Sequence, residues 1–150
     1  MTLKYKHILV AVDGSKEAEA ALKKAVGIAE RNQGTLYLAN IIDLTFGSVE
    51  AYSTEYAKKA QVKAEELLGS YKNAAATAGV DDVKIIIESG SPKEMIPKVL
   101  VEQYNIDLIV CGATGLSSAE RIFLGSVSER IVRSAKCDVL VVRPNEVISE

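Results

Sequence analysis

The stretch from Cys111 to Arg130 carries glycines and small polar residues at spacings suited to anion binding. Gly112 and Gly115 lack a Cβ, so phosphate oxygens can approach their backbone N–H groups and the chain can adopt positive φ. Gly125 and Ser126 then stand at the expected start of a helix, whose free N–H groups and positive dipole end attract phosphate. A single glycine here is more typical of a turn, and Ser126 of an N-cap. Their joint occurrence favours a polyphosphate site.

The elements that must position these residues alternate along the chain. Four helical patterns separate the strand candidates. Two present a continuous apolar face, from Ala18 to Ala29 and from Tyr56 to Ala78. The others begin at Ser91-Pro92-Lys93-Glu94 and Ser126-Val127-Ser128-Glu129, which have the sequence of capping boxes. Five nearly continuous apolar runs predict strands buried on both faces: His7–Val12, Thr35–Ile42, Val83–Glu88, Leu108–Cys111 and Val139–Val142.

This order predicts an α/β fold, a three-layer open sandwich in one domain over residues 1–150. In such sheets, ligands bind beyond the carboxyl ends of the strands, where the strand order reverses. The first strand ends in Asp13-Gly14-Ser15 and the fourth in the glycine-rich stretch, so a doubly wound sheet would bring Asp13 opposite these glycines. Neither G-x-x-x-x-G-K-[ST] nor G-x-G-x-x-G occurs, which argues against a lysine-dependent P-loop.

The spacing Gly112-x2-Gly115-x9-Gly125-Ser126 is similar to the G-x2-G-x9-G-[ST] nucleotide motif of the universal stress protein family. The opening Ile8–Ser15 and the closing Cys137–Val142 resemble the same family, and the resemblance runs from about Lys4 to Pro144. It implies an adenine nucleotide α-hydrolase-like fold with a five-stranded parallel sheet of order 3-2-1-4-5 and four helices. It also implies a homodimer formed through the last strand.

The resemblance implies roles for individual residues as well. Asp13 would hydrogen-bond the ribose, with Ala11 and Val12 beside it, and the backbone of Ile41 would hold the adenine. The ligand would be ATP, with Mg²⁺ bound mainly by phosphates and water, and no catalytic or metal-ligating residue is assigned. The ribose and phosphates would lie along residues of the glycine-rich stretch and the following helix: Gly112, Gly115, Gly125, Ser126, Val127 and Ser128.

Other reactive side chains are weaker candidates. His7, the only histidine, precedes the first strand and should lie at the opposite end of the sheet, which argues against Ser-His-Asp or Cys-His catalysis. Cys111 and Cys137 should lie about a strand length apart, ~15 Å. They are too distant for a disulfide and are expected to be packing residues.

Among the charged residues near the site, one is a candidate for binding the ligand and the others are expected to be solvent-exposed. Arg121 is a candidate for neutralising phosphate, whereas Arg130 and Arg133 are expected at the surface. Asp43 and Glu50 follow the second strand and could reach a metal, but they are more typical of a solvated loop.

Composition narrows the class of partner. The net charge is -2 from 18 basic and 20 acidic side chains, and no basic stripe suggests nucleic-acid binding. No apolar stretch approaches the ~20 residues needed to cross a bilayer, and the N-terminal segment has the pattern of a strand, not of a signal peptide. Two cysteines without a CxxC spacing favour a reducing, cytoplasmic location. At the sheet's border, Val139–Val142 would be an apolar edge covered by a second chain or by the Asn145–Glu150 tail.

With the resemblance, these features favour a cytoplasmic ATP-binding module used in stress response or signalling. No residue pair near the site forms an obvious general base, so hydrolysis is expected to be slow or absent. The alternative is an ATP hydrolase or nucleotidyl-transfer enzyme on the same fold, although the histidine-rich and S-G-G-x-D-S motifs of transfer enzymes are absent. The glycine motif disfavours a dimeric protein indifferent to nucleotide.

Overall fold

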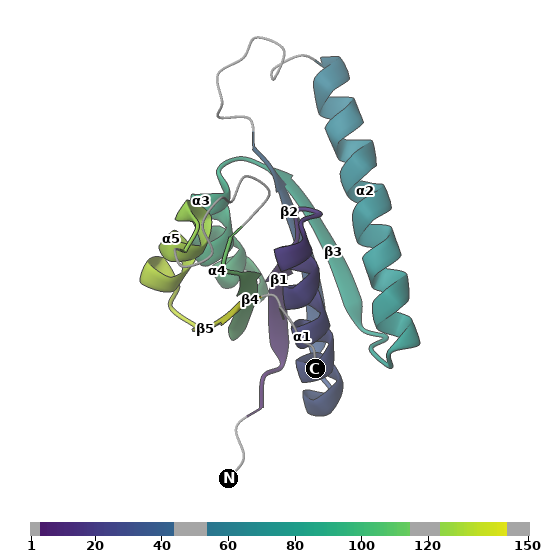
Figure 1. Ribbon diagram of the computed structural model, residues 1–150, viewed down its shortest axis with the longest axis vertical. Coiled ribbons are helices and arrows are strands. Elements are labelled where there is room, and N and C mark those ends of the chain that lie inside the picture. The colour runs from purple at the N-terminus through teal and green to yellow at the C-terminus, as the bar shows by residue number, and fades with distance from the viewer. Residues whose placement is uncertain (1–3, 44–53, 115–123, 144–150) are drawn as a thin grey trace, which may run out of the picture.

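A parallel sheet lies between two layers of helices in the computed structural model, which describes residues 4–43, 54–114 and 124–143 (Figure 1). The five strands have the order β3-β2-β1-β4-β5, which confirms the predicted fold class and strand order. In chain order the elements are β1 His7–Ala11, α1 Lys16–Asn32, β2 Thr35–Ile42, α2 Thr54–Thr77, β3 Val83–Ser89, α3 Pro92–Glu94, η2 Met95–Leu100, α4 Val101–Tyr104, β4 Leu108–Gly112, α5 Ser126–Ser134 and β5 Asp138–Val142.

The central strands are apolar throughout because both of their faces are covered. In β1, Ile8 and Val10 pack in the cluster beneath α1 and α2, whereas Leu9 packs in the cluster on the opposite face. The helices on that opposite face contribute Leu100 of η2 and Ile131 of α5 to the second cluster. In Figure 1, α1 and α2 accordingly lie on one side of the sheet, and α3, α4 and α5 lie on the other.

A helical segment that contains a π turn runs from Pro92 to Tyr104 as α3, η2 and α4. The residue at its centre is Pro97, which has no N–H to donate and would crowd the preceding turn of a regular α-helix. The wider π turn accommodates that defect. The predicted capping box is wrong here: Ser91 is the N-cap residue, but its side chain makes no capping bond, and the Glu94 carboxylate is paired elsewhere.

The start of α5 also differs from the prediction. Gly125 is the N-cap residue, with φ -65° and ψ 162°, and Ser126 is the first helical residue. Glu129 bonds Arg133 at 2.7 Å along the same helix and is not part of a capping box. A residue without a side chain therefore precedes the helix, and this N-cap residue makes no side-chain capping bond.

Two strands form the borders of the sheet. β3 carries the charged residues Lys84 and Glu88, whereas the middle of β5 is apolar, with Leu140 37% exposed. Among the helices that the structure describes, none is long and apolar enough to cross a membrane.

Candidate functional site

A topological switch point lies between β1 and β4, which pair in parallel from Ile8↔Leu108 to Val10↔Val110. The chain leaves β1 toward α1 on one face of the sheet and leaves β4 toward α5 on the other. The two connections therefore diverge at the carboxyl edge, which is where open α/β sheets bind ligands. Asp13 and the residues after Gly112 both follow this edge, as the sequence predicted.

The end of β1 is held firmly. The Val12 N–H donates to the Ala39 carbonyl at 2.9 Å, and the Val12 carbonyl accepts from Asn40 Nδ2 at 2.9 Å. Val12 itself is buried in the core, and Ala11 is half-buried on the opposite face. Asn40 was not among the predicted residues, although an amide near the carboxyl end of an apolar strand is a usable signal.

Asp13 is exposed just beyond this anchor and opens a tight turn. Its Oδ1 accepts from the Ser15 N–H at 3.0 Å, and Gly14 adopts φ +89°, a left-handed conformation that favours glycine. The Ser15 hydroxyl accepts from the Ala18 N–H at 3.1 Å and so caps α1. One carboxylate oxygen of Asp13 is thus oriented by the backbone, and the side chain remains accessible to a ligand.

Ile41 presents its backbone toward the space beyond β1. Successive residues of a strand direct their N–H and C=O groups to alternate neighbours. The Ala39 carbonyl bonds Val12 on the β1 side, and the Ile42 carbonyl bonds the Gly90 N–H at 3.0 Å on the β3 side. Ile41 therefore faces the β1 side, where the pairing of β1 has already ended at Ala11↔Ala39. A planar heterocycle can be hydrogen-bonded at such a position.

Gly112 is required by packing. A Cβ on this residue would lie 2.8 Å from Glu17 Cβ and 3.0 Å from the Glu17 carbonyl oxygen. The missing side chain lets the first turn of α1 lie directly over the end of β4. Gly112 is not among the described residues with positive φ, so the left-handed freedom allowed by the sequence is not used there.

Ser128 fixes the height of α5 above the sheet. Its buried hydroxyl donates to the Gly112 carbonyl at 2.6 Å, so this hydroxyl is already engaged within the protein. The Gly125 N–H donates to the Ala113 carbonyl at 2.7 Å, which brings the N-terminus of α5 back to the end of β4. Any contact of Ser128 with a ligand would therefore involve its backbone N–H.

The first turn of α5 offers backbone donors. The first bond within the helix runs from the Glu129 N–H to the Gly125 carbonyl at 2.9 Å. The N–H groups of Ser126, Val127 and Ser128 precede it and point along the helix axis, away from the helix. Ser126 is exposed and Val127 half-buried. The φ and ψ of Gly125 suit any residue, so its backbone conformation gives no reason for a glycine there.

The remaining candidates lie away from this edge or outside the described residues. Gly115, Arg121 and Glu50 fall in the undescribed ranges 115–123 and 44–53. His7 begins β1 at the opposite edge, and its Nδ1 lies 3.0 Å from the Tyr37 hydroxyl. Within residues 4–43, 54–114 and 124–143, no three His, Cys, Asp or Glu side chains gather to hold a metal ion.

The two cysteines are unpaired, and both contribute to the core on the α5 side. Burial raises the pKa of the Cys111 thiol to about 11 and also raises that of Cys137. Both thiols are therefore protonated at neutral pH, and the prediction that they are packing residues is confirmed.

Arg130 differs from the prediction of a simple surface residue. It is half-buried and bonds Glu94 of α3 and Ser134 of its own helix, whereas Arg133 is exposed. Because Glu94 lies 36 residues earlier in the chain, the spacing of residues within the last helix gave no sign of this pair.

Comparison with known proteins places this geometry in a family. Residues 4–143 match the model of the universal stress protein family. A universal stress protein of Staphylococcus aureus strain USA300 is 53% identical over 143 residues, which cover 95% of this chain and 86% of the relative.

Solved structures agree with that match. The universal stress protein UspA from Lactobacillus plantarum has a TM-score of 0.86 and 33% identity, covering 95% of this chain and all of that one. A universal stress protein in complex with cAMP has a TM-score of 0.72 and 26% identity, again over 95% of this chain and all of that one. The fold is the adenine nucleotide α-hydrolase-like fold that the family resemblance implied. The chain belongs to the universal stress protein family.

Proposed function

We propose that the protein is an ATP-binding module of the stress response or of signalling, active in the cytoplasm. The observation that carries the proposal is the convergence of three different binding groups on one edge of the sheet. These are the backbone of Ile41 facing beyond β1, the exposed carboxylate of Asp13, and the uncapped N-terminus of α5. In that order, these groups are chemically suited to bind the base, the ribose and the phosphates of a nucleotide.

Each group has a defined task in this proposal. The N–H and C=O of Ile41 pair with the edge of the adenine, and the Asp13 carboxylate accepts from ribose hydroxyls beside Ala11 and Val12. Gly125 leaves room for phosphate oxygens at the helix start. There the N–H groups of Ser126, Val127 and Ser128 and the helix dipole bind them. Gly112 borders the same path in this proposal, and Gly115, which lies outside the described residues, is proposed to line it as well.

Mg²⁺ fits the site only as part of the nucleotide complex. In the described part of the chain no cluster of carboxylates could bind it directly, so its ligands would be phosphate oxygens and water. The metal would supply charge neutralisation for the triphosphate. The Asp13 side chain, already oriented by the Ser15 N–H, serves the ribose in this arrangement.

A monophosphate is the specific alternative ligand, because one related structure is a complex with cAMP. The helix start at Gly125 favours the triphosphate, since several consecutive N–H groups can bind more than one phosphate. A cyclic phosphate also ties up the ribose 3′ oxygen, which Asp13 would otherwise bind. Affinity for ATP should therefore exceed affinity for cAMP.

Turnover is expected to be slow or absent. The Cys111 thiol is buried and protonated, and His7 lies at the opposite edge of the sheet. The alternative of an ATP hydrolase or nucleotidyl-transfer enzyme requires a group that activates water or a second substrate.

The direct test is to denature freshly purified protein with heat and identify the released small molecules by chromatography. Near-stoichiometric ATP supports slow-turnover binding, whereas mostly ADP favours the hydrolase. Protein freed of nucleotide is then titrated with Mg-ATP and with cAMP by calorimetry. If no nucleotide is released and neither ligand binds, the proposal fails.

We also propose that two copies pair through β5. Among the described residues no strand pairs with the outer side of this border strand, and Leu140 on it is exposed. The opposite border, β3, instead carries Lys84 and Glu88, charges that discourage edge pairing. Pairing β5 with its copy in a two-fold dimer would cover the unprotected edge.

A further inference from the structure

Contacts with the sheet hold α5 in place from below. Ser128 bonds the end of β4, and Ile131 packs in the core beneath the helix. Both contacts fix the height of α5 above the sheet. α5 also lies beside α3 and η2 on the same face of the sheet.

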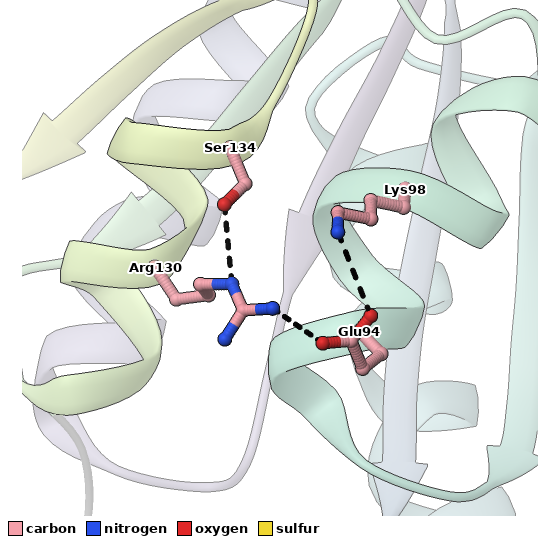
Figure 2. A network of polar contacts seen from close by, with 4 residues as sticks. All are labelled: Glu94, Lys98, Arg130 and Ser134. Atoms are coloured by element: carbon pink, nitrogen blue, oxygen red, sulfur yellow. Dashed lines mark hydrogen bonds and ion pairs between the residues drawn. The ribbon is translucent and has the colours of Figure 1, made fainter.

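Figure 2 shows the polar contact that joins α5 to this neighbouring segment. The Arg130 guanidinium reaches across from α5 to the Glu94 carboxylate in the first turn of the neighbouring helical segment. Its Nε donates to the Ser134 hydroxyl at 3.1 Å, which holds the guanidinium against its own helix. On the other side, Lys98 Nζ lies 3.8 Å from Glu94 Oε1 and holds the carboxylate.

Both ends of this link are attached to well-anchored structure. Glu94 directly precedes the π turn, which buries Ile96, Pro97 and Leu100 against the sheet. Arg130 lies one turn from Ser126 and next to the buried Ile131. Among the ion pairs within the described part of the chain, the one between Arg130 and Glu94 joins α5 to another element.

We infer that Glu94 and Arg130 are a positioning pair for nucleotide binding, which fixes the direction in which the first turn of α5 presents its N–H groups. This inference rests on the proposed ATP site. Hydrogen bonds weaken steeply with misalignment, and the phosphate end of the nucleotide depends on several of them at once. A helix held in place before binding also loses less conformational freedom when the ligand arrives.

Arg130 itself acts through the helix and not as a phosphate ligand. Its guanidinium is already engaged by Glu94 and by Ser134. Loss of the pair should therefore weaken the binding of the phosphates and leave the binding of the nucleoside unchanged. This difference separates positioning of α5 from a general loss of structure.

The experiment measures calorimetric affinities for Mg-ATP and for adenosine in Glu94→Gln and Arg130→Gln. Both should bind Mg-ATP about fivefold more weakly, the scale of one partly exposed ion pair, with adenosine affinity unchanged. Arg130→Lys, which keeps one charged donor, should recover most of the loss. Thermal unfolding of each variant shows that it is folded.

Arg133→Gln is the matched control. It removes the same charge from the same helix, but Arg133 pairs with Glu129 inside α5 and makes no ion pair with another element in the described ranges. Its ATP affinity should stay close to that of the wild type. Equal weakening in this variant would mean that only net charge matters and would overturn the inference, as would a parallel loss of adenosine affinity. Failure of the wild type to bind Mg-ATP would instead refute the proposed function on which the inference rests.

Discussion

At the scale of single residues, two glycines of one motif have different physical reasons to be glycine. Gly112 is buried against Glu17, where a Cβ would approach to 2.8 Å. Gly125 has a φ of -65°, which any residue can adopt, and as the N-cap residue of α5 it has no side chain with which to cap the helix. The first glycine therefore serves packing, and we propose that the second leaves the helix start open to a ligand.

Gly112→Ala should cost stability. The added methyl group would force α1 away from the end of β4, and such overpacking costs about 1–3 kcal/mol. Urea unfolding at neutral pH measures the loss. An unchanged midpoint would show that α1 can move aside without cost.

Gly125→Ser should weaken nucleotide binding without loss of stability, in contrast to Gly112→Ala. Serine is as good an N-cap residue as glycine or a better one, so the free energy of unfolding should stay the same or rise slightly. The new hydroxyl would accept from the first-turn N–H groups and compete with phosphate for them. We expect Mg-ATP affinity to fall roughly tenfold, as for the loss of one or two charge-assisted hydrogen bonds. Unchanged affinity would place the phosphates elsewhere.

Asp13 can be tested through the ligand. If its carboxylate accepts from the ribose hydroxyls, the wild type should prefer ATP to 2′,3′-dideoxy-ATP by roughly tenfold, the scale of a hydrogen bond to a charged group. Asp13→Ala should bind both nucleotides with similar, weaker affinity. Competition binding with a fluorescent ATP analogue measures both ratios. A preference that survives in the variant would assign ribose recognition to another residue.

At the scale of the elements, α1 and α2 are joined by a partly buried polar contact. The Tyr71 hydroxyl donates to Glu19 Oε2 at 3.1 Å. Burial, and then this bond to a carboxylate, raise the pKa of Tyr71 to about 12 from 10.0. The folded protein therefore retains this proton at a pH where the unfolded chain has lost it.

The free energy of unfolding should therefore decline at alkaline pH, because the folded protein binds the Tyr71 proton more tightly than the unfolded chain does. The stabilisation is complete below pH 10.0 and is lost as the pH rises toward about 12. Tyr71→Phe should remove about 1–2 kcal/mol of the alkaline decline in the free energy of unfolding. Urea titrations at neutral and alkaline pH in the wild type and the variant measure the difference. Parallel pH profiles would show that Tyr71 does not contribute.

Hydrophobic patterning predicted the strands well, because all five are apolar enough to stand out. The observed bounds of β2 agree with Thr35–Ile42, and the other four strands differ at their ends by a residue or so. The helix starts were harder, since serine followed three residues later by glutamate also occurs where the glutamate pairs with a distant cation. Glu94 is such a case, because its partner Arg130 lies on another helix.

At the scale of the whole molecule, the position of the candidate site followed from topology. Strands β1 and β4 had to be neighbours for Asp13 to meet the glycine-rich stretch, and the sheet order makes them so. The contacts that shape the site were not readable from sequence, because they join residues far apart in the chain. Examples are Gly112 with Glu17 and the amide of Asn40 with the Val12 carbonyl.

The two borders of the sheet allow a matched test of the proposed dimer. Leu140 on β5 is 37% exposed and Ile85 on β3 is 38% exposed, so the two side chains differ mainly in which edge carries them. A lysine on an edge strand discourages pairing with another chain. Leu140→Lys should therefore convert a dimer to a monomer, whereas Ile85→Lys should leave the dimer intact.

Sedimentation velocity at micromolar concentration distinguishes the monomer expected for Leu140→Lys from the dimer expected for Ile85→Lys. ATP affinity should be kept in the Leu140→Lys monomer, because the candidate site is built from β1, β2, β4 and α5 of one chain and β5 lies at the border. A dimer that survives Leu140→Lys and dissociates in Ile85→Lys would assign the interface to β3. A monomeric wild type would show that β5 is left open or is covered by the chain itself.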